Sequence, residues 1–517
     1  RVLIMSKSRR LFSFGKLLLT VVLGISMILA TTACGEKQGD GKLNRELTEA
    51  EKKYGVLYDG KPITIRVDLN NYTPTVNTEA TEEDPDVFLS SGVIAEEFTK
   101  MFPNVTIEWE RTKGSDWPYW MTTQVAADAA PDIVFLHGAQ HADRGWFYRL
   151  NELLDEKNVF VDKYDSWKAM FPDYVWDSYM TTDAAGNILA VPYTLYAGTA
   201  TAYYYNKSIF KELNITPPTE WNDFISICKK INKAGYISVA PWSANKTIST
   251  DVWDIQFSLG PSYASKIIDV WDLDKNGSMS QNELLRAAYK GEFYAKNNKA
   301  VLDMYSKVKE KYTDVLQTGA ASTDYEALWN QGKVAMMEDG LWRYPTELSN
   351  TKRDFEFGII PVPVATGQTS QYAADVEYGK GPYQPPICTS LNIVKSAVDK
   401  KGEGAKEVCA RYLQWITKPE NLDMVVLESH GDGIGAVYGT QIPPELNEWF
   451  QSSFPKISNC QWVTGFTNDS QRKMSKQLEM WIRGMIDDQT FMEGYDAELK
   501  SGMETLIKAL NIDTAGW

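Results

Sequence analysis

"VIAEEFTKMFPNVTIEWE", residues 93–110, runs from a helix directly into a strand, and this order decides the fold class. Apolar side chains recur at helical spacing in its first part, which predicts an amphipathic helix that the proline ends. These side chains are Val93, Ile94, Phe98 and Phe102. Apolar and polar residues then alternate over residues 105–110, as they do in a half-buried strand. A helix followed at once by a strand is typical of an α/β protein.

The segments on either side of this stretch repeat the same order. Residues 63–69, ITIRVDL, alternate like a strand, and residues 117–130, WPYWMTTQVAADAA, are predicted to form a helix. Residues 131–136, PDIVFL, form a continuous apolar run that suits a strand buried on both faces. The pattern returns at residues 355–364 and 390–397. The chain is therefore predicted to belong to the α/β class, with a parallel sheet.

The composition narrows the possible functions. A formal net charge of −15 argues against binding to nucleic acid or to an anionic surface. A length of 517 residues suggests two or three domain-sized cores. The spacing of Cys34, Cys228, Cys388, Cys409 and Cys460 fits no zinc pattern, and the sequence leaves open whether any of them form a disulfide.

The N-terminal residues have the pattern of an export signal. Arg9, Arg10 and Lys16 precede an uncharged apolar run, residues 17–30, which is too short for a stable membrane span. The run leads into TTAC, which resembles the end of a bacterial lipoprotein signal. In such signals the cysteine, here Cys34, receives fatty acyl chains such as palmitate and becomes the mature N-terminus.

This resemblance divides the first part of the chain. Residues 1–33 are predicted to be the signal peptide, and residues 34–60, polar and without apolar periodicity, a flexible tether. A lipid on Cys34 would hold the protein at the extracellular face of the bacterial cell membrane. Thr31 departs from the pattern, which usually has leucine there, so ordinary signal cleavage with an incidental cysteine is the alternative.

Several stretches with a recognisable order cover most of residues 61–430. They are IAEEFTKMFPNVTIEW, AADAAPDIVFL, DAAGNILAVPYTLY, TAYYYNKSIFKELNITPPTEWNDF, ALWNQGKVAMMEDGLW and YLQWITKPENLDMVV. In content and order they resemble the extracellular solute-binding proteins of family 1, the lipoprotein receptors of carbohydrate ABC importers. Residues 205–224 and 332–342 are the most specific parts of this resemblance.

The resemblance implies a two-lobed α/β fold with a ligand cleft between the lobes and hinge crossings that join them. One lobe would comprise residues 61–195 and 362–435, and the other residues 196–361 and 436–517. The crossings are expected at AVPYTLY, IIPVPV and GIGAVYG. The implied function is the capture of an oligosaccharide by a monomer without enzymatic activity, and its delivery to an ABC permease in the membrane.

DLDKNGSMSQNE, residues 272–283 in the second lobe, fills every position of a twelve-residue calcium loop. The predicted ligands at positions 1, 3, 5, 7 and 12 are Asp272, Asp274, Asn276, Ser278 and Glu283. A solvated acidic turn between two helices is the alternative interpretation. A single loop favours a structural calcium ion over a sensor. The long chain and this loop look most like the oligosaccharide-binding subgroup of the family, which includes alginate and fructan binders.

Sugars present apolar C–H faces and many hydroxyl groups, so their sites combine flat aromatic rings with planar hydrogen-bonding groups. Loops at the carboxyl ends of strands are favoured positions for such groups. Trp342 matches the family's sugar-stacking tryptophan, and Arg343 beside it is a candidate donor. The other predicted ligand-binding residues are Asn71, Tyr72, His137, Gln140, Tyr193, Trp242, Trp253, Asp375, Glu377 and Trp462.

The sequence gives little support to an enzymatic function. His137 and His141 stand four residues apart but lack the glutamate of a zinc protease, and no G-x-S-x-G motif occurs. A secreted polysaccharide hydrolase with a calcium site is the main alternative, because 68 acidic residues could include a catalytic carboxylate pair. A dockerin-like module is a third class, but it would need two calcium loops.

Overall fold

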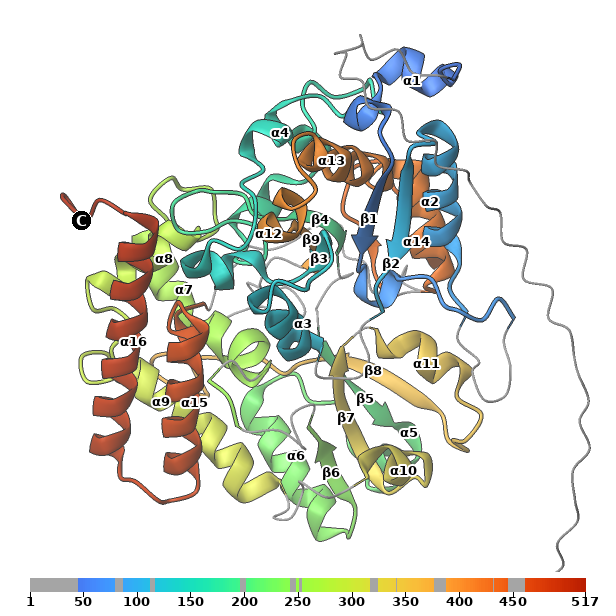
Figure 1. Cartoon of the computed structure of the whole chain (residues 1–517). Coiled ribbons are helices and arrows are strands. Elements are labelled where there is room, and N and C mark those ends of the chain that lie inside the picture. Colours follow the sequence, from blue (N-terminus) through green and yellow to red (C-terminus); the bar gives the residue numbers. More distant parts are fainter. Residues whose placement is uncertain are drawn as a thin grey trace, which may run out of the picture. The chain divides into compact units, whose positions relative to one another are not determined.

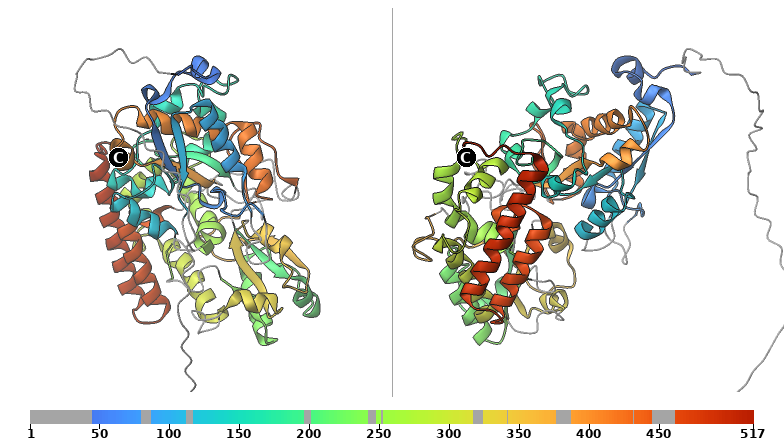
Figure 2. Two further views of the ribbon diagram at one scale, coloured as in Figure 1. Left: turned by 45° about the vertical axis from the view of Figure 1, so that its right-hand side comes forward. Right: turned by 60° about the vertical axis from the view of Figure 1, so that its left-hand side comes forward.

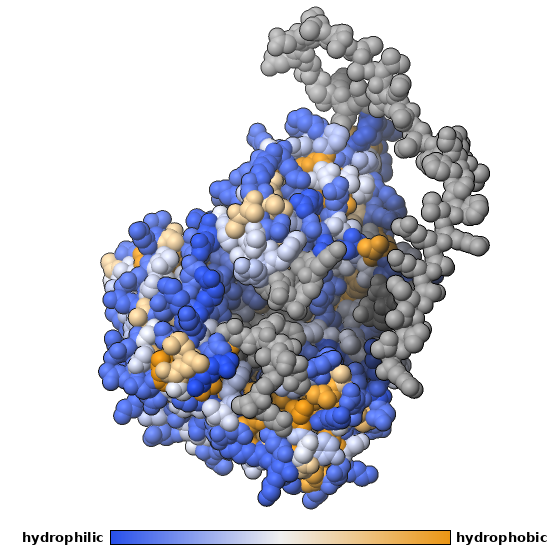
Figure 3. Space-filling view, turned by 60° about the horizontal axis from the view of Figure 1, so that its bottom comes forward, coloured by the Kyte–Doolittle hydropathy of each residue, from blue (hydrophilic) through white to orange (hydrophobic). Residues whose placement is uncertain are grey.

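The computed structural model describes residues 45–79, 87–111, 117–195, 201–241, 248–250, 253–316, 324–340, 342–375, 387–430, 432–444 and 461–517. The predicted signal peptide, Cys34, Trp242 and Glu377 lie outside these residues. No helix in the described part combines the length and the apolar composition that a membrane crossing requires. The face drawn in Figure 3 is mostly hydrophilic, with apolar residues in small groups, in keeping with the formal net charge of −15.

Within the described residues, the first sheet has six strands in the order β10-β4-β9-β3-β1-β2. They are β1 (Ile63–Val67), β2 (Val105–Trp109), β3 (Ile133–Phe135), β4 (Val191–Leu195), β9 (Ile387–Ile393) and β10 (Ile434–Gly435). β1 is parallel to β2 and β3, which confirms the predicted parallel pairing of these strands. β9 and β10 pair antiparallel with their neighbours, so the sheet is mixed, and the predicted parallel arrangement holds for β1, β2 and β3 alone. The chain enters β9 after passing through the second sheet, and no βαβ crossover fixes its direction.

Helices α2, α13 and α14 pack beside this sheet (Figure 1). The helices of this part are α2 (Ser90–Met101), α3 (Trp117–Ala126), α4 (Asn151–Asp155), α12 (Lys395–Asp399), α13 (Ala405–Ile416) and α14 (Pro419–Glu428). The predicted apolar face of α2 is confirmed at Ile94, Phe98 and Phe102, which are fully buried, whereas Val93 is 43% exposed. The Trp415 indole N–H donates to the Ile94 carbonyl oxygen over 2.9 Å and so fixes α13 against α2.

The second sheet has the order β6-β7-β5-β8 among the described strands. They are β5 (Thr201–Asn206), β6 (Ile237–Ala240), β7 (Val334–Gly340) and β8 (Phe357–Pro361). β5 is antiparallel to β7 and β8, and β6 is parallel to β7. Every residue of β7 is buried, so this strand forms the centre of the sheet.

The described residues of the second part contain more helices than strands. They are α5 (Lys207–Glu212), α6 (Trp221–Lys233), α7 (Gly260–Trp271), α8 (Gln281–Tyr289), α9 (Lys299–Glu310), α10 (Tyr325–Asn330), α11 (Arg343–Ser349), α15 (Asn468–Ile482) and α16 (Asp488–Leu510). The C-terminal helices α15 and α16 run side by side in all views of Figures 1 and 2. Their apolar faces join the core of the second sheet through Leu478, Tyr495 and Leu499.

Each sheet has its own hydrophobic core. Ile65, Phe98 and Leu391 belong to the core of the first sheet, whereas Tyr203 and Met336 belong to that of the second. The chain builds β1 to β4 in the first sheet, β5 to β8 in the second, and then returns to the first with β9 and β10. The structure thus has two α/β lobes, and the boundaries given above for them stay predictions.

The prediction of a flexible tether up to residue 60 is wrong for residues 45–60. Helix α1 (Glu49–Tyr54) begins with a capping box between Thr48 and Glu51. The Thr48 hydroxyl donates to the Met101 carbonyl oxygen over 2.6 Å, and Leu57 is buried in the first core. A capping box satisfies the first N–H groups of a helix too short to show apolar periodicity, so the periodicity argument missed it.

Candidate functional site

Two tryptophan rings meet beside the end of β7. Trp253 and Trp342 pack edge to face, with ring centroids 5.6 Å apart and an interplanar angle of 72°. A Cβ atom on Gly340, the last residue of β7, would overlap the Trp342 indole, so the glycine lets this ring lie across the strand end. Both tryptophans are half-buried. Such rings offer a flat apolar surface that suits the C–H face of a sugar.

The Arg343 guanidinium lies in a network of carboxylates next to this ring pair. It donates to Asp339 over 3.2 Å, to Glu347 over 2.6 Å and to Glu326 over 2.9 Å. Its side chain is only 8% exposed. Burial raises the pKa of Asp339 to about 6, although Arg343 opposes the rise. Both terminal NH groups of Arg343 thus donate to protein carboxylates, whereas its buried Nε has no hydrogen-bond partner among the described residues, so its role as a ligand donor stays a prediction.

The 3-10 turn η2 (Asn70–Tyr72) follows β1 and places two predicted residues beside a buried carboxylate. The side chains of Asn71 and Tyr72 are hydrogen-bonded to Asp432, which stands just before β10. Burial raises the pKa of Asp432 to about 6, and the two hydrogen bonds oppose that rise. Asn71 itself is exposed, so this cluster extends to the surface of the protein.

Asp432 also lies near the second sheet. Burial raises the pKa of Tyr204, on β5, and the nearby Asp432 carboxylate adds to that rise. The Tyr204 hydroxyl donates to the Gly340 carbonyl oxygen over 2.9 Å, at the strand end that the Trp342 ring covers. Tyr204 is therefore hydrogen-bonded beside the Trp342 ring and lies within electrostatic range of Asp432. Asn71, Tyr72, Trp253, Trp342 and Asp432 together form the candidate site.

Asp432 was missed by sequence reasoning. Its signal is its position in GDGIGAVYG, immediately before the third expected crossing. The segment is rich in glycine, and one of these glycines, Gly433, is required by the packing. A Cβ atom on Gly433 would lie 2.9 Å from the Leu195 carbonyl oxygen and 3.1 Å from the Tyr72 hydroxyl. The close approach of the chain to β4 therefore requires glycine next to Asp432.

Two of the predicted ligand residues are core residues. Tyr193 is fully buried, and its ring packs edge to face on Tyr72 with a centroid distance of 5.8 Å. Trp462 is 2% exposed and stacks on Phe293 at 4.5 Å. Because both rings are covered by protein side chains, their placement argues against the predicted ligand contacts.

The remaining predicted residues have local roles in the described structure. His137 packs edge to face against Tyr179 at 5.5 Å, and Gln140 is its hydrogen-bond partner. Burial lowers the pKa of His137 to about 4, so its ring is neutral at pH 7. Asp375 accepts the Gly367 N–H over 2.8 Å and closes a turn.

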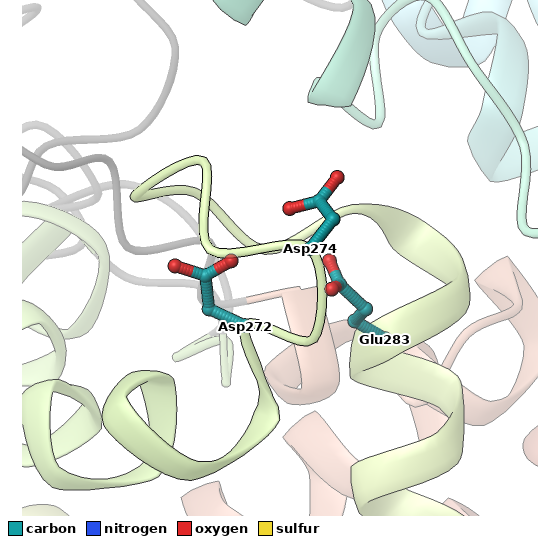
Figure 4. A group of neighbouring side chains, drawn as sticks. All are labelled: Asp272, Asp274 and Glu283. Atoms are coloured by element: carbon teal, nitrogen blue, oxygen red, sulfur yellow. The ribbon is translucent and has the colours of Figure 1, made fainter.

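The predicted calcium loop connects α7 to α8. Figure 4 shows the side chains of Asp272, Asp274 and Glu283 around this connection, and one carboxylate oxygen from each lies within 4.8 Å of the others. Gly277 has a φ of 89°, in the left-handed region that position 6 of such a loop requires of its glycine. Carboxylates this close together fit a hard divalent cation with oxygen ligands.

A fourth carboxylate, that of Asp177, reaches this loop from a distant part of the chain. The Asn276 amide donates to Asp177 over 3.3 Å. Burial raises the pKa of Asp177 to about 6, and the carboxylates of Asp274 and Glu283 add to the rise. Crowding of like charges in this way is relieved when a cation binds among them.

Comparison with known proteins gives a family match over most of the chain. A family model described as bacterial extracellular solute-binding protein matches residues 85–422. A curated relative, an uncharacterised ABC transporter extracellular-binding protein of Pyrococcus horikoshii, is 24% identical over 313 residues. The match covers 56% of this chain and 64% of that relative, so it spans less than two thirds of the relative's length.

The fold is similar to that of solved solute-binding proteins. A family 1 extracellular solute-binding protein from Bifidobacterium longum subsp. infantis has a TM-score of 0.54 at 17% identity, over 85% of this chain and 100% of that chain. A chitin oligosaccharide binding protein has a TM-score of 0.57 at 14% identity, over 86% and 99%. The protein RafE in complex with raffinose has a TM-score of 0.54 at 15% identity, over 85% and 100%. These similarities show the two-lobed fold.

Proposed function

Because the chain belongs to the family of bacterial extracellular solute-binding proteins, we propose that it captures an oligosaccharide and delivers it to the permease of an ABC importer. The observation that carries this proposal is the Trp253–Trp342 ring pair beside the end of β7. Asn71 and Asp432 would supply hydrogen-bonding groups, and Asp432 lies within electrostatic range of Tyr204, which donates to the Gly340 carbonyl oxygen beside the Trp342 ring. The solved structures named for raffinose and for a chitin oligosaccharide support a sugar as the class of solute.

The capture would proceed by closure of the two lobes. The ring pair belongs to the second lobe, and Asn71 belongs to the first, so a ligand that contacts both gains more from the closed form than from the open form. Such a ligand shifts the population toward the closed form. An affinity of about 1 µM would correspond to roughly −8 kcal/mol.

A thermal-shift screen with plant and microbial oligosaccharides tests this function. At least one of them is expected to raise the melting temperature, since a ligand at 100 times its Kd stabilises the folded state by about 2.7 kcal/mol. Chromatography after incubation is expected to return that ligand at its original chain length. Shorter products would instead support the polysaccharide hydrolase, and the absence of any shift would contradict sugar binding.

We also propose that Cys34 carries a lipid anchor at the extracellular face of the membrane. The lipoprotein-like end of the apolar N-terminal run and the extracellular family support this placement. The mass of the mature N-terminal peptide, isolated from membranes, tests the proposal directly. A diacylglyceryl-modified Cys34 is expected, whereas an unmodified N-terminus that begins elsewhere would favour ordinary signal cleavage.

We further propose that residues 272–283 bind a structural calcium ion. Asp272, Asp274 and Glu283 would hold it through their carboxylates, together with the Asn276 side chain and the Ser278 backbone carbonyl. The full set of loop ligands and the clustering of three carboxylates support this proposal. The ion would neutralise negative charge at the junction of α7 and α8, with Asp177 beside it.

Removal of calcium is expected to lower the stability of the protein and to leave sugar affinity within about twofold. At 1 mM calcium and a Kd of about 0.1 mM, the bound ion contributes about 1.4 kcal/mol to the free energy of unfolding. Thermal melts with and without chelator measure this loss. The loss should disappear in Glu283→Gln but persist in Asp165→Asn, which changes an exposed carboxylate. A large fall in sugar affinity with an unchanged melting temperature would contradict a structural role.

A further inference from the structure

Asp432 is a buried carboxylate, and no cationic side chain pairs with it in the part of the chain that the structure describes. It is 7% exposed, and its hydrogen bonds come from the uncharged side chains of Asn71 and Tyr72. No ion pair of Asp432 is found among the described residues, and its Oδ1 atom has no hydrogen-bond partner there. Burial of an unpaired anion costs free energy, and such groups concentrate at functional sites.

The carboxylate would be ionised at neutral pH despite this cost. Burial raises the pKa of Asp432 to about 6, so above that pH the group carries a negative charge. In the unfolded chain an aspartate has a pKa of about 4. Because the pKa of Asp432 is higher in the folded protein, its ionisation lowers the free energy of unfolding as the pH rises from about 4 to about 6. Because the charged carboxylate destabilises the folded state, replacing it with a neutral side chain should not lower the free energy of unfolding.

The second half of the candidate site also has an excess of negative charge. Two arginines and three carboxylates form the network behind the Trp253–Trp342 ring pair. They are Arg343, Arg353, Glu326, Asp339 and Glu347. With all five ionised, the network is short of one positive charge.

We propose that the site selects neutral oligosaccharides over uronic acid oligosaccharides, and that Asp432 is the residue that sets this preference. The Oδ1 atom of Asp432 accepts a hydrogen bond from a sugar hydroxyl, a donor that neutral sugars supply in abundance. A uronate carboxylate brought to the same place has no proton to donate and meets a like charge in a buried setting, where repulsion is poorly screened. The inference rests on the proposed function, since it concerns the same site.

Asp432 also orients Asn71. Because the Asn71 side chain is bonded to the carboxylate, its amide N–H group points toward Asp432 and its carbonyl oxygen is left for the ligand. An outward carbonyl oxygen is again an acceptor for a hydroxyl and not a donor for a carboxylate. Both groups at this end of the site therefore favour the same class of ligand.

Titration calorimetry with two matched sets of tetrasaccharides tests the proposal on the full chain. The neutral set contains xylose, glucose, mannose and N-acetylglucosamine oligomers, and the uronate set contains galacturonate, mannuronate and guluronate oligomers. The tightest ligand is expected to be neutral, and every uronate at least tenfold weaker. A uronate as the tightest ligand would overturn the inference and leave the proposed function intact. Failure of both sets to bind would remove the proposed function, and the inference with it.

The Asp432→Asn variant tests the assignment to this residue. Discrimination between the two sets is expected to fall below about threefold, with an equal or higher melting temperature, because the amide removes an unpaired buried charge. The matched control is Glu356→Gln, which neutralises a carboxylate that is 85% exposed, and it should keep the wild-type discrimination. Full discrimination in Asp432→Asn would overturn the role of Asp432. If that variant fails to fold, the wild-type ranking of the two sets still decides the preference.

Discussion

The Trp342→Ala variant is expected to bind its oligosaccharide at least tenfold more weakly than the wild type, a loss of about 1.4 kcal/mol or more. The indole lies across the end of β7 and packs edge to face on Trp253. Its removal takes away a flat apolar surface and the ring that orients its neighbour. Calorimetric titration of the folded variant with the ligand found by thermal shift measures the loss.

Two further variants distinguish the loss of the Trp342 ring from a nonspecific effect of substitution on binding. Trp342→Phe keeps an aromatic platform and is expected to lose less affinity than Trp342→Ala. Gly340→Ala keeps the indole but forces it off the strand end, because the new Cβ atom would overlap it, and so should also weaken binding. Unchanged titration curves for Trp342→Ala would take this tryptophan out of the site.

The Lys311→Ala variant is expected to lower the free energy of unfolding by about 3–5 kcal/mol, because it leaves two buried carboxylates without their cation. The Lys311 ammonium group donates to Asp254 over 2.7 Å and to Glu338 over 3.4 Å. All three side chains are at most 5% exposed. Glu338 lies on β7, so this ion cluster also holds the strand that leads to Trp342. Urea unfolding of the wild type and the variant measures the difference.

Lys229 provides the matched control for Lys311. Its ammonium group pairs with Asp314 over 3.1 Å, but the two side chains are 44% and 48% exposed. Exposed pairs contribute about 0–1 kcal/mol, so Lys229→Ala should change stability little. Equal losses in the two variants would mean that burial of the Lys311 cluster does not matter, contrary to the argument above.

The local elements could be predicted because their signals lie within a few residues of one another. The helical face of Ile94, Phe98 and Phe102 and the parallel pairing of β1 with β2 and β3 follow from periodicity and order. The antiparallel direction of β9 could not be predicted, because it depends on the path of the chain through the second lobe. Helix α1 was not predicted, because it has no apolar periodicity and is stabilised by a cap and by one long-range hydrogen bond.

The candidate site depends even more on contacts between residues far apart in the sequence, which local patterns do not predict. Its residues come from four separate stretches of the chain, and composition could not distinguish the ring of Trp342 from that of Trp462, which is buried in a stack. Asp432 stands next to an expected crossing, but its burial beside η2 depends on residues far away in the sequence and could not be predicted. The clustering of Asp272, Asp274 and Glu283 could be predicted because one stretch supplies all three carboxylates, whereas the approach of Asp177 could not.

The most direct test of the central claim is a calorimetric titration of the wild-type protein with the oligosaccharide that gives the largest thermal shift, followed by mass spectrometry of the recovered sugar. A saturable isotherm with one ligand per chain and a sugar of unaltered mass is the predicted result. Heat without saturation, or recovery of shorter sugars, would contradict a receptor that holds its ligand between two lobes and releases it intact.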